Sequence, residues 1–236
     1  MILKNSILFR FFGFFFGCIC FITTPTISAQ QKDCEEVFSY YYDNFLWGCT
    51  EDGGPSSGWG SHLKFAKPYI EFLTQFIHDN QITSVVDLGC GSWEFSQYID
   101  WDGIDYVGVE VVKQLVDLNN EKFATDNIKF IKGDILTMDL PDGALLVCKD
   151  VLQHLQDSDI QLFLSRIKKY NHCLITNDIA ISIEDNIELT KKNRNSKRRG
   201  SNRPLDLTLP PFNVKGDKVL TYPNANHIKQ TIYIQN

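Results

Sequence analysis

Residues 84–94 have the sequence S-V-V-D-L-G-C-G-S-W-E, a short apolar run followed by two glycines. The run is of the length and composition typical of an inner strand of a parallel sheet. Gly89 and Gly91 come next, and glycines let a backbone turn tightly and approach a ligand closely. We expect a helix to begin near Trp93 and to point its amide groups back at that ligand. The stretch therefore predicts a loop that binds a nucleotide cofactor.

Three further segments continue the pattern of strands that end in polar residues. These predicted strands cover 105–110, 127–132 and 144–148. The first ends in Glu110, about twenty residues beyond the glycine turn, the spacing at which a carboxylate meets ribose hydroxyls. Asp134 follows the second strand and Asp150 follows the third. Four strand ends thus place polar side chains on one rim of the predicted sheet.

The glycine spacing alone is weak evidence, because Glu94 stands where a G-x-G-x-x-G fingerprint has its third glycine. The four motifs taken in order are more specific. They are D-L-G-C-G, V-G-V-E, G-D-I and C-K-D-V-L-Q-H-L, one after each strand. From residue 81 to the C-terminus the chain thereby resembles the class I S-adenosylmethionine-dependent methyltransferases. The segments at 56–61, 93–101 and 203–213 (R-P-L-D-L-T-L-P-P-F-N) are similar to a bacterial subgroup of that family.

The order of elements predicts the fold class. Strands that alternate with helices imply a parallel sheet with helices on both faces, and a helix over 158–170 and a fifth strand over 173–177 continue the alternation. The last two predicted strands, 219–222 and 228–234, flank a turn and form a hairpin. A terminal hairpin that inserts an antiparallel strand distinguishes methyltransferases from dinucleotide dehydrogenases. We expect a doubly wound, mostly parallel Rossmann-like α/β sheet with a C-terminal antiparallel hairpin.

Three parts of the chain are expected: a leader at 1–29, an N-terminal helical cap at 30–80 and a cofactor-binding domain at 81–236. In the cap, aromatic residues at helical spacing predict a helix over 34–46, and Ser61 is expected to cap a helix that runs to Asp79. Ser57, Trp59 and Gly60, together with Ser61, form either a lid over the cofactor or an ordinary surface turn.

The leader has the layout of a secretory signal peptide. Lys4 and Arg10 precede an apolar run at 11–22, and small residues follow as far as Ala29, where cleavage is expected. The apolar run is shorter than the ~20 residues that a membrane span needs, although an uncleaved anchor stays open. We therefore expect an extracytoplasmic or secreted protein, with a cytoplasmic one as the alternative. Cys34 and Cys49 are the pair that could form a disulfide in an exported protein.

The resemblance implies S-adenosylmethionine as the cofactor and assigns roles to the strand ends. Glu110 would accept hydrogen bonds from the ribose, while Gly89 and Gly91 would admit the methionine moiety. Asp134 and the Ile135 amide would receive the adenine. Two plainer alternatives remain, in which Glu110 is a solvated acid at a strand end and Asp134 only forms a turn.

The remaining site residues concern the amino end of the cofactor and the chemistry. Asp87 matches the acid of the family's first motif and would order the amino end. Asp150 and His154 lie where the acceptor would approach and are the candidate catalytic bases, although methyl transfer does not require one. Asp150 and Gln153 also have capping-box spacing, which favours a purely structural role. No metal site is expected; the alternative is a magnesium site formed by Asp150, Asn177 and Asp178, which end adjacent strands.

The predicted function is transfer of a methyl group to an unidentified small or medium acceptor. The alternatives are a catalytically decayed cofactor-binding protein and a secreted interaction protein that keeps the fold. The formal net charge of −6 and the pI near 5.4 argue against a protein-wide attraction to nucleic acid. A basic cluster at 191–203 lacks the interleaved aromatic residues that stack on bases, so nucleic acid is an unlikely partner. A membrane would be contacted only through an uncleaved leader, and no pattern predicts an oligomeric state.

Overall fold

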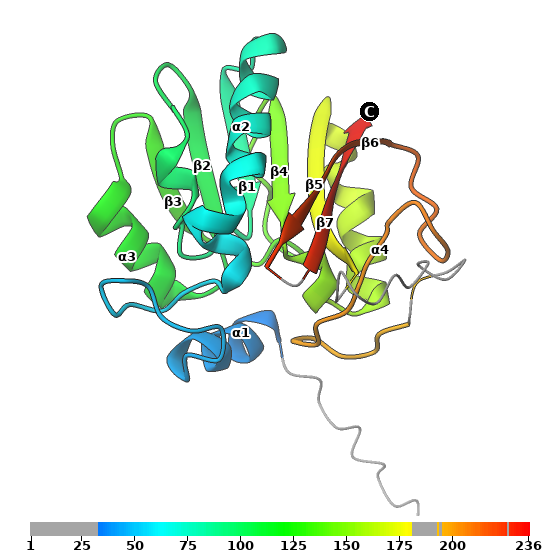
Figure 1. Ribbon diagram of the computed structural model, residues 1–236, viewed down its shortest axis with the longest axis horizontal. Helices are drawn as coiled ribbons and strands as arrows, with labels where there is room; N and C mark the ends of the chain where they lie inside the picture. Colours follow the sequence, from blue (N-terminus) through cyan, green and yellow to red (C-terminus); the bar gives the residue numbers. More distant parts are fainter. Residues whose placement is uncertain (1–32, 181–192, 194, 226) are drawn as a thin grey trace, which may run out of the picture. The chain divides into compact units, whose positions relative to one another are not determined.

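The computed structural model describes residues 33–180, 193, 195–225 and 227–236. These residues form a seven-stranded sheet of order β3-β2-β1-β4-β5-β7-β6 (Figure 1). The strands are β1 (Ser84–Leu88), β2 (Asp105–Glu110), β3 (Ile128–Lys132), β4 (Leu145–Lys149), β5 (His172–Ala180), β6 (Asp217–Asn224) and β7 (His227–Gln235). Only β7 runs against its neighbours, being antiparallel to both β5 and β6. The expected fold class, including the antiparallel C-terminal hairpin, is confirmed.

The strand order positions a crevice at the edge of the sheet. From β1 the chain adds β2 and β3 on one side, and then crosses to add β4 and β5 on the other. In open α/β sheets, ligands bind beyond the carboxyl ends of the strands at the point where the order reverses. Here that point lies between β1 and β4, which pair in parallel.

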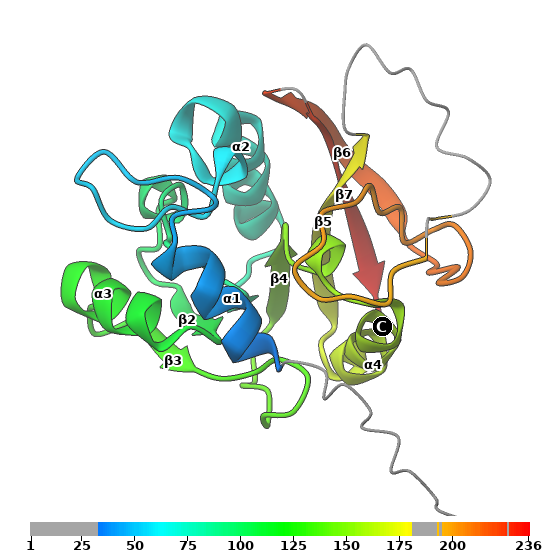
Figure 2. The same cartoon turned by 90° about the horizontal axis from the view of Figure 1, so that it is seen from below.

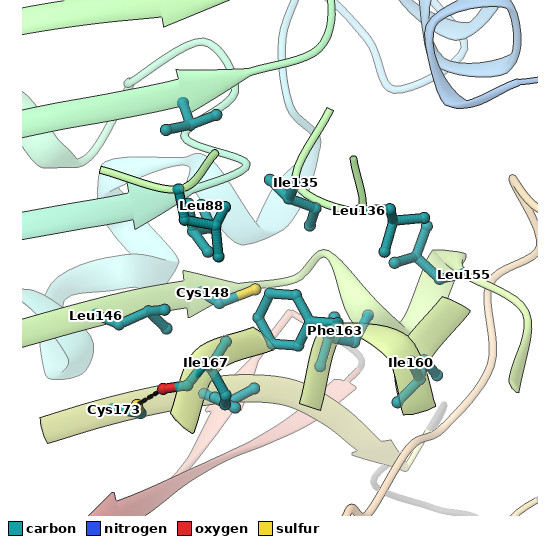
Figure 3. Packing of buried hydrophobic residues seen from close by; sticks show 14 of the residues in the cluster. Leu88, Ile135, Leu136, Leu146, Cys148, Leu155, Ile160, Phe163, Ile167 and Cys173 are labelled. Carbon is teal, nitrogen blue, oxygen red and sulfur yellow. Dashed lines mark hydrogen bonds between the residues drawn. The ribbon is translucent and has the colours of Figure 1, made fainter. Parts of the chain in front are cut away.

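Four α-helices surround the sheet: α1 (Cys34–Asp43), α2 (Leu63–Asp79), α3 (Lys113–Phe123) and α4 (Asp157–Arg166). On one face, α2 packs Tyr69 and Leu73 against β1 and β4. On the other, α4 buries Ile160 and Phe163 against Leu146 and its neighbours (Figure 3). The view from below shows α1 lying across the strand ends (Figure 2). Helices therefore cover both faces of the sheet, and α1 covers the ends of its strands.

The helix expected to begin near Trp93 is absent from the fully described segment between β1 and β2. A single 3₁₀ turn, Ser96–Tyr98, takes its place. Trp93 itself has a left-handed φ of 57°, and its ring lies 5.0 Å from that of Phe123 and 5.3 Å from that of Phe130. Because burying this large ring fixes the backbone outside the helical region, no helix N-terminus points at a ligand here.

Several expected boundaries also shift. The first helix stops at Asp43 rather than near Leu46, and α4 ends at Arg166 before a 3₁₀ turn. Ser61 does not cap α2; it belongs to a 3₁₀ turn, Trp59–Ser61, and His62 is the N-cap, without a side-chain hydrogen bond. The leader at 1–29, much of the basic cluster (Lys191, Lys192 and Arg194) and Asn226 of the final turn lie outside the described residues. Among the described helices, none has both the length and the apolarity needed to cross a membrane.

Candidate functional site

A cavity of about 740 Å³ opens at the carboxyl ends of the parallel strands. One half is lined by residues that follow β1, β2 and β3. The other half is lined by residues that follow β4 and by residues of β5 and β7. Segments from α1 to the start of α2 close over both halves, since Tyr42, Trp47 and Ser57 all line the cavity. The sequence-predicted residues of the four strand ends are thus brought together in one site.

Glu110 is buried at the end of β2, and its carboxylate already accepts three backbone hydrogen bonds. Its Oε1 accepts from the amides of Val111 (2.8 Å) and Val112 (3.0 Å), and its Oε2 accepts from the amide of Gly91 (3.1 Å). Burial raises the pKa of Glu110, and the three amides act against that rise. A carboxylate offers about four lone-pair sites, so room for about one further donor from the cavity remains on Oε2. Glu110 therefore also holds the glycine loop in place, a role that the sequence did not suggest.

The two glycines of the loop are required by the protein's own packing. Gly89 and Gly91 have φ values of 83° and 57°, in the left-handed region. A Cβ on Gly89 would lie 2.4 Å from a Val151 methyl carbon, and a Cβ on Gly91 would lie 2.3 Å from Ser57 Oγ. Both glycines line the cavity, but the close approach that demands glycine is made by Val151 and Ser57.

Asp87 lies at the inner wall of the cavity. Its Oδ2 accepts a hydrogen bond of 2.7 Å from the Tyr106 hydroxyl. Burial raises the pKa of Asp87 to about 6, against the lowering effect of that hydrogen bond and of Lys149. The ionisation of this carboxyl group therefore changes with pH in the range around pH 6.

Asp134 and Ile135 both line the cavity beyond β3. Asp134 Oδ1 accepts a hydrogen bond of 2.8 Å from the Leu136 amide, which is the turn-forming arrangement left open by the sequence. Ile135 is buried in the core cluster that also contains Leu136. Both residues belong to the cavity wall, and the turn-forming hydrogen bond uses one oxygen of Asp134.

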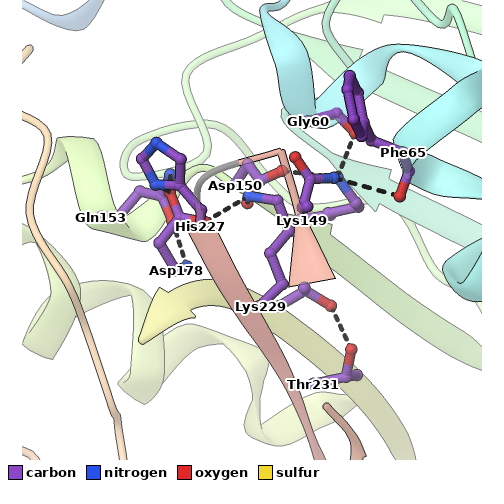
Figure 4. Close-up of polar contacts among 11 residues, drawn as sticks. Gly60, Phe65, Lys149, Asp150, Gln153, Asp178, His227, Lys229 and Thr231 are labelled. Carbon is purple, nitrogen blue, oxygen red and sulfur yellow. Dashed lines mark hydrogen bonds and ion pairs between the residues drawn. The ribbon is translucent and has the colours of Figure 1, made fainter. Parts of the chain in front are cut away.

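The other half of the cavity contains a group of charged residues that we call the β4–β7 charge cluster: Lys149, Asp150, Asp178, His227 and Lys229 (Figure 4). Lys229 Nζ lies 2.6 Å from Asp150 Oδ1 and 2.6 Å from Asp178 Oδ1. Lys149 Nζ lies 2.6 Å from Asp150 Oδ2. His227 Nδ1 lies 3.2 Å from Asp178 Oδ2, an ion-pair contact when the imidazole is protonated rather than an aligned hydrogen bond.

Asp150 is held as a carboxylate by this cluster. Although burial acts to raise it, the pKa of Asp150 lies well below its usual range because Lys149 and Lys229 flank the carboxylate. The expected capping box does not form. Gln153 instead donates to Asp178 Oδ2 (3.1 Å) and accepts from the Asp178 amide (2.7 Å), and α4 begins only at Asp157. The capping alternative is wrong because the Gln153 side chain hydrogen-bonds to Asp178 of β5 instead of to a helix N-terminus.

His154 also lines the cavity, on the side of the N-terminal cap. Its Nδ1 lies 3.2 Å from the Ser201 carbonyl oxygen, and its ring lies 5.3 Å from the ring of Trp47. Because a carbonyl only accepts, Nδ1 carries the proton in this contact and Nε2 keeps a lone pair. Burial lowers the pKa of His154, which favours this neutral form.

The geometry disfavours the magnesium alternative. The Lys229 ammonium group occupies the space between Asp150 and Asp178 where a cation would be held. Asn177 precedes Asp178 in β5, so its side chain leaves the opposite face of the sheet. Among the residues that the structure describes, no group of three or more His, Cys, Asp or Glu side chains is arranged to hold a metal ion.

The predicted lid residues Ser57, Trp59, Gly60 and Ser61 line the cavity. Ser57 joins the lid to the loop after β1, because its Oγ lies 2.9 Å from Ser92 Oγ and accepts from the Ser92 amide at 2.8 Å. The Gly60 carbonyl oxygen accepts a hydrogen bond of 3.0 Å from Lys149 Nζ. These bonds fasten the segment over the cavity, so it is more than an ordinary surface turn.

The described basic residues at 197–203 do not line the cavity, whereas Cys34, Cys49 and Cys90 do. Arg199 pairs with Asp159 and Arg203 with Asp157, each at 2.7 Å, so these two arginines fasten the loop to the start of α4. Lys197 and Arg198 are exposed. The five cysteines of the described residues, Cys34 and Cys49 among them, are free thiols.

Comparison with known proteins supports the architecture. Residues 85–171 match the family model described as a methyltransferase domain, and no curated protein matches the chain. Magnesium protoporphyrin IX methyltransferase from Synechocystis PCC 6803, solved with bound SAH, has a TM-score of 0.58 at 12% identity, covering 85% of this chain and 98% of its own. A protein from Pyrococcus horikoshii OT3 has a TM-score of 0.53 at 15% identity, covering 77% of this chain and 92% of its own. Human N-acetylserotonin methyltransferase, solved in complex with SAM, has a TM-score of 0.50 at 15% identity, covering 87% of this chain and 60% of its own.

Proposed function

We propose that the protein is an S-adenosylmethionine-dependent methyltransferase that acts on a small or medium acceptor. The observation that carries this proposal is the cavity at the reversal point of the sheet, with the Glu110 carboxylate buried at the end of β2 and facing it. The methyltransferase-domain match over 85–171 spans the segment that builds this part of the site. The solved methyltransferases that share the fold, two of them with the cofactor or its product bound, add support.

The described residues fit the cofactor. Glu110 Oε2 retains room for a ribose hydroxyl, and Asp87 is a carboxyl group available to the amino end. The backbone at Gly89 and Gly91 would accommodate the methionine moiety, and the surface formed by Asp134 and Ile135, which this proposal assigns to the adenine, lies on the β3 side of Glu110. When bound, the cofactor supplies a methyl group on a sulfonium, which is already reactive toward nucleophiles. The protein then contributes mainly by orienting the acceptor and excluding water, and proximity of this kind can supply roughly 7–11 kcal/mol.

Of the two candidate bases, His154 suits the role better. A base must accept a proton, and the Asp150 carboxylate has little tendency to do so while two ammonium groups hold it. The neutral imidazole of His154 keeps the Nε2 lone pair available. We therefore assign Asp150 to positioning within the charge cluster, and His154 to proton transfer where the acceptor requires it.

Calorimetric titration with S-adenosylmethionine and S-adenosylhomocysteine tests the proposal. Binding of both at one site per chain is the expected result, and binding of neither would overturn it. Binding without turnover on a broad panel of acceptors would favour the second candidate, a catalytically decayed cofactor-binding protein. The pairing of Arg199 and Arg203 with acidic residues of α4 argues against an interaction protein that relies on these two arginines, whereas Lys197 and Arg198 are exposed.

We further propose that the chain is exported through its leader and is extracytoplasmic, with the cytoplasmic alternative kept open. The order of positive charge, apolar run and small residues at 1–29 supports export. N-terminal sequencing of protein from a fractionated native host tests this. A mature chain beginning at Gln30 outside the membrane is expected, whereas an intact Met1 in the cytosol would rule export out.

A further inference from the structure

In the β4–β7 charge cluster each oxygen of the two carboxylates already accepts a hydrogen bond from a neighbouring side chain. Asp150 accepts from Lys149 and Lys229, one on each oxygen. Asp178 accepts from Lys229 on Oδ1 and from Gln153 on Oδ2. Lys229 carries three N–H groups and uses two of them on described partners, so one is left for a ligand in the cavity that the residue lines. The wall therefore presents a lysine N–H group without a described partner beside carboxylates that are already paired with ammonium groups.

His227 adds a further hydrogen-bond donor to this wall of the cavity. Its Nδ1 faces Asp178, so protonation at this atom is favoured, and the pKa of His227 is raised by its contact with Asp178. The protonated ring adds a second N–H, on Nε2, and a further positive charge beside Lys229. The two lysines and two aspartates balance in charge, so protonation of His227, which its contact with Asp178 favours, gives the cluster a net positive charge.

The mouth of the same cavity is apolar. Phe45, Leu46 and Trp59 line it and are 51%, 53% and 65% exposed. Large apolar side chains gathered at the entrance of a cavity are typical of a site that binds an apolar group. Phe45 also has a φ of 51°, an unfavourable backbone conformation for a bulky residue, which places strain at this entrance.

We propose that the acceptor is an amphipathic carboxylic acid, whose carboxylate binds Lys229 and His227 and whose apolar body lies against Phe45, Leu46 and Trp59. This inference rests on the proposed function, because it names the acceptor class for the same cavity. An amine in that position would face Lys229 and protonated His227 and would be repelled. A neutral alcohol could accept a hydrogen bond but would lose the charge-assisted part of the interaction.

Calorimetry with three ligands of one shape tests the inference: 4-phenylbutyrate, 4-phenylbutan-1-ol and 4-phenylbutylamine, each titrated in the presence of S-adenosylhomocysteine. We expect the carboxylate to bind about tenfold or more tightly than the alcohol, since hydrogen bonds to a charged group are roughly twice as strong as those between neutral groups. The amine is expected to bind most weakly. Butyrate, which lacks the ring, measures the contribution of the apolar mouth and is expected to bind more weakly than 4-phenylbutyrate.

Matched variants locate the two parts of the site. Lys229→Gln combined with Asp178→Asn keeps the net charge and is expected to abolish the preference for the carboxylate. Lys218→Gln, on neighbouring β6 and outside the cavity, is the control and should leave the preference unchanged. His227→Gln offers a second, milder variant should the double variant not fold, and is expected to reduce the preference.

Trp59→Ala should weaken the binding of 4-phenylbutyrate but not that of butyrate. Tyr98→Ala, which removes an exposed ring outside the cavity, is the control and should change the affinity for neither ligand.

Equal or tighter binding of the alcohol or the amine would overturn the inference while leaving the proposed function intact. A preference for the carboxylate that survives both the double variant and His227→Gln would also overturn it. Affinity for S-adenosylhomocysteine is measured separately in each protein, so a failure of the proposed function appears in that titration alone.

Discussion

Lys229 Nζ lies 2.6 Å from Asp150 Oδ1, so an ammonium group on β7 is paired with a carboxylate just beyond the end of β4, 79 residues away in sequence. The same ammonium group also pairs with Asp178, and the side chains of Lys229 and Asp178 are only 4% and 5% exposed. The C-terminal hairpin is thereby fixed to the parallel part of the sheet at the edge where the cavity lies.

Lys229→Met should lower the free energy of unfolding by about 3–5 kcal/mol, because breaking a buried ion pair leaves carboxylates without their partner. Chemical denaturation measures this. Lys218→Met is the control, since the Lys218 side chain is 45% exposed and pairs with one carboxylate, Asp206, which is buried but also accepts a hydrogen bond from the Thr208 hydroxyl. A similar loss of unfolding free energy in both variants would show that burial of Lys229 does not increase the stabilisation that its ion pairs provide.

Glu110→Ala should weaken S-adenosylhomocysteine binding by about tenfold or more, and Asp150→Ala should weaken it far less, because the proposed function assigns the ribose to Glu110. Calorimetry measures both affinities. Because Glu110 also holds the Gly91 amide, thermal melting of each variant is needed to show that the loop is intact. Affinity within twofold of the parent in a folded Glu110→Ala protein would contradict the placement of the ribose.

Cofactor affinity should decrease as the pH falls through about 6, because the proposed function places the amino end of the cofactor beside Asp87, whose pKa burial raises to about 6, and a cationic amino group would favour the ionised carboxylate. Asp87→Asn should lose this dependence.

Folding stability should change with pH in the opposite direction. Asp87 binds a proton more tightly in the folded protein than in the unfolded chain, so its stabilising contribution is complete below pH 3.8 and is lost as the pH rises through about 6. Denaturation of the parent at a series of pH values should show a decline that Asp87→Asn lacks, on the order of 3 kcal/mol.

Methyl transfer should be insensitive to a strong chelator, because Lys229 fills the place between Asp150 and Asp178 that a divalent cation would need. The rate with and without chelator, followed through formation of S-adenosylhomocysteine, measures this. Loss of activity on chelation, with recovery when magnesium is restored, would support the metal alternative.

The sequence predicted the features that depend on local pattern. Apolar runs placed the parallel strands, and the end of each strand placed Asp87, Glu110, Asp134 and Asp150 on one rim, which the cavity confirms. The helix expected at Trp93 failed because its ring is packed by Phe123 and Phe130 from later in the chain, and such non-local packing overrides a local preference.

The charge cluster was missed for a similar reason. Lys229 is one polar residue in an alternating strand, and only the register of β7 on β5, which pairs it with Asp178, reveals its partners. Likewise, Gln153 had the spacing of a capping residue, but Asp178 on β5 binds it instead. Lys149 was visible in the C-K-D motif, yet nothing in the sequence indicated that it would reach the Gly60 carbonyl in the lid.

A crystal structure of the protein with S-adenosylhomocysteine tests the central claim most directly. The account predicts a ligand in the cavity with a ribose hydroxyl within hydrogen-bonding distance of Glu110 Oε2 and the adenine against Asp134 and Ile135. A ligand bound elsewhere, or one in the same cavity whose ribose does not contact Glu110, would contradict it.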